Sequence, residues 1–136
     1  MERLTNSLLA SVLVLGFYVY VQTFAGTIEG RYSPVVVGVS INRVEPVGDT
    51  KSRIWGEFQK VRNCEFVGLE FYLGTPANSA RVDLDIEEAS KQRGEGFEDF
   101  GPWLVQLDPE QLSGRAFAIV RHKCHPFWIT ETGFYP

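Results

Sequence analysis

Two cysteines and two histidines are the residues of this chain best suited to specific chemistry. Cys64 stands alone, whereas Cys124 lies between His122 and His125 in the run RHKCHP. In an extended strand, residues two apart face the same side, so His122 and Cys124 would point together and, with Cys64, supply three ligands for zinc. His125 would point away unless Pro126 turns the chain. The i, i+2 spacing and the absence of a C-x-x-C pair are not typical of structural zinc sites.

The same cysteines could instead bond to each other. An even number of cysteines in an exported domain indicates a disulfide, and closing a loop of this length would stabilise the fold by about 4 kcal/mol. We therefore predict a Cys64–Cys124 disulfide. The alternatives are two separate thiols, or a metal-binding or thiol-redox protein centred on Cys64, His122 and Cys124, which would need both sulfurs reduced.

A second candidate is a short acidic stretch, residues 83–88. Its carboxylates are Asp83, Asp85, Glu87 and Glu88. Several carboxylates this close together can chelate a hard cation such as calcium. Apolar residues occupy alternate positions of the stretch, however, as in a strand with one buried and one wet face, and no D-x-D-x-D-G loop is present. We therefore predict a solvated strand face here and no metal site.

Enzymatic chemistry and nucleic-acid binding find no support in the sequence. There is no G-x-S-x-G elbow, no glycine-rich phosphate loop and no H-E-x-x-H motif. The chain has 13 Lys and Arg against 17 Asp and Glu, a net charge of −4, and no window where basic residues concentrate. The basic surface that nucleic acid requires is therefore missing. We predict a non-enzymatic protein with no cofactor and no nucleic-acid partner.

Aromatic residues gather in two late segments, GEGFEDFGPW and HPFWITETGFYP. Exposed aromatics beside carboxylates suit a protein partner, whereas the alternative is that they pack under the loop or at the end of a sheet as a small core cluster. A free aromatic tail would also suit docking on another protein. The candidate partner-binding residues are Phe97, Phe100, Trp103, Trp128, Phe134 and Tyr135.

The first element that must position these residues is an apolar segment, residues 8–25, which reads LLASVLVLGFYVYVQTFA and carries no charge. As a helix it extends about 27 Å, slightly less than the roughly 30 Å hydrocarbon core. It has no polar face, which disfavours a helix packed on a domain surface. It is either an uncleaved signal-anchor or a signal peptide cleaved after Ala25, where Thr23 and Ala25 fit an A-x-A-like site.

The bulky aromatic run at residues 17–20 favours the anchor interpretation. Aromatic rings towards one end of a span suit the membrane–water interface. The chain then divides into residues 1–26, the N-terminal helix, and residues 27–136, an extracytoplasmic domain. That domain would be periplasmic in a bacterium, and secreted if the signal is cleaved.

Residues 27–136 show the alternation and turn signals of about seven short strands, which predicts an all-β, antiparallel β-sandwich. The expected strands cover residues 34–41, 54–59, 66–73, 82–86, 103–107, 116–124 and 127–130. The expected core consists of apolar residues on one face of each strand. These are Val37, Val39, Ile41, Val67, Leu69, Phe71, Val82, Leu84, Ile86, Leu104 and Val120.

One short helix is predicted near residue 110. Asp108 is a helix N-cap residue, Pro109 suits the first helical position, and Gly114 would end the helix within two turns. A helical turn before the penultimate strand resembles the corner of immunoglobulin-type sandwiches. Phe117 and Ile119 stand where an immunoglobulin domain has Tyr and Cys, so the tyrosine corner and the usual inter-sheet disulfide do not carry over. The prediction is an immunoglobulin-like architecture.

A wider resemblance covers most of the chain. The N-terminal span, the stretch WGEF–QKVRNCEF in residues 55–66 and the late RHKCHPFW resemble small single-span membrane proteins encoded by bacteriophages, whose function is generally unassigned. The resemblance implies a place in the bacterial envelope and a role in infection or host takeover. We expect a membrane-anchored protein-binding or structural module, with self-association left open. A protein acting on envelope components through the span itself is a further interpretation.

Overall fold

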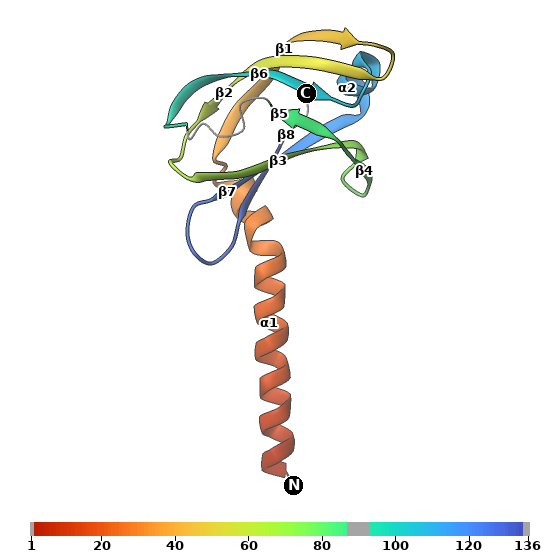
Figure 1. Ribbon diagram of the computed structural model, residues 1–136. Helices are drawn as coiled ribbons and strands as arrows, with labels where there is room; N and C mark the ends of the chain where they lie inside the picture. Colours follow the sequence, from red (N-terminus) through yellow and green to blue (C-terminus); the bar gives the residue numbers. More distant parts are fainter. Residues whose placement is uncertain (1, 87–92, 135–136) are drawn as a thin grey trace.

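The computed structural model describes residues 2–86 and 93–134. Helix α1 (Glu2–Tyr32) projects from a β-sandwich, with the N-terminus at the far end of the helix (Figure 1). Its apolar stretch is long enough to cross a membrane and is not buried inside the folded domain. The predicted apolar helix is thus present. It continues past residue 26, however, and its last two turns belong to the domain.

The described strands form two antiparallel four-stranded sheets, so the predicted mostly-β fold is confirmed. The strand order is β1-β2-β6-β5 in one sheet and β4-β3-β7-β8 in the other. The strands are β1 (Val36–Val47), β2 (Lys51–Lys60), β3 (Glu65–Thr75), β4 (Asn78–Val82), β5 (Leu84–Ile86), β6 (Gly96–Val105), β7 (Ala116–Lys123) and β8 (Thr130–Phe134).

Two differences from the expected strands have clear causes. The strand expected at residues 82–86 is divided at Asp83, because the chain changes sheets there: β4 pairs with β3 and β5 pairs with β6. Strand β6 begins at Gly96, in a segment whose glycines, proline and carboxylates suggest a loop. Pairing along almost the whole of β2 holds this segment in a strand despite its composition.

Bulges decide which side chains reach the core between the sheets. The pairing of β3 with β7 contains one extra residue, Val67, which is 50% exposed although it was expected in the core. An extra residue in β6 similarly lets Phe100 and Val105 both face inward, so Leu104 is not among the buried residues. A bulge reverses the alternation of a strand, which strict period-two reasoning cannot anticipate.

The central core lies between the sheets and includes several residues expected there. Phe71 is fully buried, and Leu69, Val82 and Leu84 pack against the central cluster. The cluster itself also draws on strands and loops that the alternation did not single out. Its members are Ile54, Phe71, Phe100, Val105, Leu107, Leu112, Ala116 and Ala118.

Helix α2 (Pro109–Arg115) is present where it was predicted, between β6 and β7. The Asp108 carboxylate accepts a 2.8 Å hydrogen bond from the backbone N–H of Gln111, as expected of an N-cap residue. Leu112 is buried on the inner face of this helix and joins the central core.

Candidate functional site

The C-terminal turns of α1 pack directly against strand β8, an edge strand of its sheet. A side-chain carbon at Gly26 or Gly30 would collide with the carbonyl oxygen of Ile129 or Glu131 respectively. Four residues of helix rise about 6 Å and two residues of strand about 6.7 Å, so the two spacings nearly match. Helix and strand backbones can therefore approach closely at two successive points.

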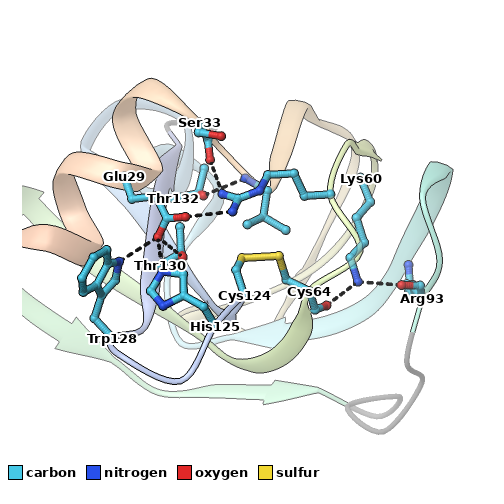
Figure 2. Close-up of a disulfide and its surroundings, with 12 residues drawn as sticks. Glu29, Ser33, Lys60, Cys64, Arg93, Cys124, His125, Trp128, Thr130 and Thr132 are labelled. Atoms are coloured by element: carbon cyan, nitrogen blue, oxygen red, sulfur yellow. Dashed lines mark hydrogen bonds and ion pairs between the residues drawn. A yellow bond between two sulfur atoms is a disulfide. The ribbon is translucent and has the colours of Figure 1, made fainter.

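Glu29, one residue before Gly30, receives the main polar contacts of this junction (Figure 2). Its Oε2 accepts hydrogen bonds from Trp128 Nε1 at 2.8 Å and Thr130 Oγ1 at 2.7 Å, and lies 3.1 Å from His125 Nε2. Its Oε1 pairs with the guanidinium of Arg62 at 2.8 Å. One carboxylate thus connects the helix to the β2–β3 loop, the β7–β8 loop and β8.

The short connection from α1 to β1 is also fixed in place. Arg62 donates a 2.7 Å hydrogen bond to the carbonyl of Ser33, and the carbonyl of Val35 accepts from Val61 N–H at 2.9 Å. Val35 is completely buried, and its N–H lies 3.4 Å from Thr132 Oγ1. The helix therefore enters the sandwich without a free linker.

The predicted Cys64–Cys124 disulfide is present in the structure, close to this junction (Figure 2). Cys64 precedes β3 and Cys124 follows β7, and the neighbouring residues Glu65 and Lys123 are paired across the two strands. The bond therefore joins adjacent strands of one sheet. With both sulfurs in the bond, neither is a thiolate, so the Cys64–His122–Cys124 metal alternative requires a reduced chain.

Two basic side chains, Lys60 and His122, are buried between the sheets near the disulfide. Lys60 Nζ donates to the carbonyl oxygens of Cys64 at 2.8 Å and Arg93 at 2.6 Å, and burial lowers its pKa. His122 is 3% exposed, and its Nδ1 has no hydrogen-bond partner among the described residues. Burial, together with the nearby Lys60 charge, lowers the pKa of His122 to about 4, so the imidazole is neutral at pH 7.

These side chains line a cavity of about 80 Å³ between the sheets. Lys60, Arg93 and His122 contribute its polar groups, and the remaining lining is apolar. A neutral imidazole with an unpaired nitrogen is the main unsatisfied polar group facing this space. The cavity is a feature of the core and lies outside the α1–β8 junction.

The acidic stretch behaves as a strand face in its described part. Asp83 and Asp85 are exposed, with half-buried Val82 and Leu84 as their neighbours. Glu87 and Glu88 lie outside the described residues. Within residues 2–86 and 93–134, no group of three or more His, Cys, Asp or Glu side chains is placed to hold a metal ion.

The six candidate partner-binding aromatics do not form one surface. Phe100 is buried and stacks on Trp103, with ring centroids 4.2 Å apart, as the core-cluster alternative expects. Phe134 packs edge-to-face on Phe71. Trp128 is held by Glu29, and Tyr135 lies outside the described residues. Among the five candidates that the structure describes, Phe97 alone is strongly exposed, at 83%.

Glu29, Arg62 and the two glycines of the junction were not predicted from the sequence. A usable signal was the run GTIEG at residues 26–30, where a carboxylate and two glycines follow directly on an apolar span. A charge at the end of a span needs a partner, and small residues four apart allow close packing.

No protein-family model, curated protein or solved structure matches this chain. Function has to be inferred from the geometry described above.

Proposed function

We propose that this protein is a membrane-anchored, extracytoplasmic β-sandwich that acts as a non-enzymatic protein-binding or structural module. The observation that carries the proposal is the continuity of the chain from an exposed apolar helix into a disulfide-bonded sandwich without a free linker. Such a molecule presents its domain at a fixed position beside the membrane. A phage origin, which the sequence resemblance implies, is consistent with this arrangement.

The anchor interpretation draws support from the path of α1. The helix is unbroken across Ala25, where a signal peptide would be cleaved. The next residue, Gly26, is packed against the backbone of Ile129, immediately before β8. Cleavage after Ala25 would therefore cut the helix directly before a residue that packs on the domain. The disulfide in turn supports an oxidising, extracytoplasmic location for the domain.

An immunoglobulin-like identity is supported by the strand order. If β1, β2, β5 and β6 are taken as strands A, B, D and E, the first sheet reads A-B-E-D. The second sheet then places β3, β7 and β8 as C, F and G, with β4 as an extra edge strand beside C. Helix α2 occupies the E–F connection. The disulfide joins C to F within one sheet, unlike the inter-sheet bond of immunoglobulin domains.

The first experiment tests the anchor and the bond together. The full chain is purified from membranes and its intact mass is measured after thiol alkylation without prior reduction. Full-length, unalkylated protein is the expected result. Loss of the first 25 residues would replace the anchor with a secreted domain. Two alkylated thiols would remove the disulfide, and a zinc adduct under native conditions would then favour the Cys64–His122–Cys124 alternative.

The second experiment tests partner binding through Phe97, the exposed aromatic of β6. A photo-crosslinking amino acid replaces Phe97 in the full chain, and the control places it at Val44 on β1, which is also exposed. We expect one discrete crosslinked species at residue 97, formed in intact cells and absent at residue 44. Equal and diffuse crosslinking at both positions would contradict a specific partner at this surface.

A further inference from the structure

We infer that the β7–β8 loop, residues 124–129, lies in the membrane–water interface and contacts phospholipid headgroups and the upper acyl chains. The inference rests on the anchoring part of the proposed function. It concerns a different surface from Phe97, because β6 belongs to the sheet that does not contain β8. In Figure 1 the loop extends from the sandwich on the same side as the projecting helix.

The loop lies beside the part of the helix where the apolar segment ends. A groove between the two is lined from the helix by Gln22, Thr23, Gly26 and Thr27, and from the loop by residues 125–129. Gln22 and Thr23 are inside the apolar segment, residues 8–25. The loop is therefore level with the end of the segment that would cross the bilayer.

Bilayer thickness places this level at the membrane boundary. The apolar segment covers about 27 Å, slightly less than the roughly 30 Å hydrocarbon core, so the boundary falls within a turn of its ends. If one end lies at residues 22–27, the loop beside those residues is at the depth where headgroups meet acyl chains. A span seated in this way brings the loop to the lipid without any rearrangement.

The side chains of the loop suit that depth. Phe127 is 68% exposed and has no place in the core. Trp128 is half-buried, with its indole N–H bonded to Glu29. Lys123, the last residue of β7, is exposed and can reach towards lipid phosphates. Aromatic rings with a neighbouring cation are the pattern found at membrane interfaces.

Two acidic groups beside the loop, Glu29 and Glu131, are paired with basic side chains. Glu29 is engaged by Arg62, and Glu131 accepts a 3.0 Å hydrogen bond from Arg121 Nε. Their charges are therefore largely compensated within the protein. Lys123, just before the loop, has no ion pair among the described residues and lies opposite Glu65 of β3. Its positive charge favours the negative headgroups of an anionic leaflet.

The test measures membrane depth in the full chain, reconstituted into nanodiscs of phosphatidylcholine and phosphatidylglycerol with acyl chains brominated near the headgroup. Trp55, Trp103 and Trp128 are replaced by Phe, and a single Trp is introduced by Phe127→Trp. The matched control in the same background is Phe97→Trp, at the other strongly exposed aromatic of the sandwich. Phe17→Trp, measured in nanodiscs whose acyl chains are brominated near the bilayer centre, reports insertion of the helix itself, because residue 17 is at the middle of the apolar segment.

We expect bromine to quench Trp emission at position 127 several-fold more than at position 97. Quenching at 17 together with equal, weak quenching at 127 and 97 would overturn the interface position of the loop and leave the anchor intact. Absence of quenching at 17 would overturn the anchor. If the tryptophan-free background fails to fold, headgroup-spin-labelled lipids provide the same measurement on the unmodified chain, through relaxation enhancement of the amide of Phe127.

Discussion

Glu29 occupies a site where an unpaired carboxylate would be costly. It is mostly buried at the junction of α1 and the sandwich, and its oxygens accept from Arg62, Trp128 and Thr130. Hydrogen bonds to a charged group contribute more than those between neutral groups, and removing one partner leaves the others unsatisfied. A single residue of the helix thus contributes to the stability of three separate segments of the domain.

Replacing Glu29 should loosen the junction. We expect Glu29→Ala to lower the free energy of unfolding by about 2 kcal/mol, because the Trp128 and Thr130 donors and the Arg62 charge lose their acceptor. The measurement is thermal unfolding in detergent, followed by circular dichroism. Glu57→Ala is the matched control, since Glu57 is exposed on β2 and should change stability by less than about 0.5 kcal/mol. Equal effects of the two substitutions would refute the role of Glu29.

His122 should make the domain sensitive to moderate acid. Burial holds its pKa at about 4 in the folded state, against 6.5 unfolded. Between these values the unfolded chain binds the extra proton, so stability is complete above pH 6.5 and declines as the pH falls towards 4. The full loss corresponds to about 3 kcal/mol. Denaturant titrations of the wild-type chain between pH 7 and pH 4 measure it.

The control for this pH effect is His122→Phe, which keeps an aromatic ring beside Phe66. At pH 7 it should be neutral or stabilising, because it removes the unpaired Nδ1. Its stability should decline less than that of the wild type between pH 6.5 and pH 4. Parallel profiles for the two proteins would show that His122 does not carry the effect.

Helix α1 packs on strand β8, and this contact joins the helix to the sandwich. An exposed edge strand invites pairing with another chain, and here the helix covers the edge of β8. The spacing Gly26-x-x-x-Gly30 is the one that membrane helices use to approach one another closely. In this protein the same spacing serves a contact between a helix and a strand.

A methyl group at Gly30 should disrupt this contact. Gly30→Ala places a carbon against the carbonyl of Glu131, and we expect a loss of about 1–3 kcal/mol with a shift in tryptophan emission as the helix moves away from Trp128. Gly16→Ala is the control, because nothing lies within 4 Å of a side-chain carbon there. Unfolding midpoints and emission spectra of the two variants in the same detergent make the comparison. If both variants match the wild type, the close packing is refuted.

The disulfide also joins two elements, because it links the end of β7 to the start of β3. Its partners are 60 residues apart in sequence. Loop-closure entropy predicts a loss of about 4 kcal/mol when the bond is absent, a large share of the stability of a domain this size. Denaturant unfolding of Cys64→Ala/Cys124→Ala against the wild type measures it. A difference below about 1 kcal/mol would mean that the bond contributes little.

Sequence patterns predicted the individual helices and strands better than they predicted the contacts between them. The apolar span, the N-cap at Asp108 and the mostly-β fold follow from local composition and periodicity. The exposure of Val67 depends on a bulge, and the strand at β6 depends on pairing with β2. Neither has a local signal. The Glu29–Arg62 pair joins residues 33 positions apart, so only the folded chain brings it together.

At the scale of the whole molecule, helix α1 and the sandwich meet at the α1–β8 junction. The apolar segment of the helix contributes no residue to the hydrophobic core of the sandwich. The side chains of residues 5–20 are exposed, Gln22 and Thr23 line the groove beside the β7–β8 loop, and Gly26 and Gly30 are packed in the domain. The fold of the sandwich should therefore depend little on the sequence that precedes Gly26.

Exchanging residues 8–25 for an unrelated apolar helix of equal length should leave the unfolding midpoint unchanged. The crosslink expected at residue 97 should also persist, because the proposed partner contacts the sandwich. Loss of the crosslink with an unchanged midpoint would favour the interpretation in which the span itself contacts envelope components. The measurements are circular dichroism in detergent and crosslinking in cells.

The packed connection between α1 and β1 also has a mechanical consequence. A flexible linker would let the domain turn freely while the helix stayed upright, but Ser33 and Val35 are held by Arg62 and Val61. A sideways force on the sandwich therefore acts on the helix as a torque. In the proposed membrane-anchored arrangement, a pull on the sandwich would therefore tilt the helix within the bilayer.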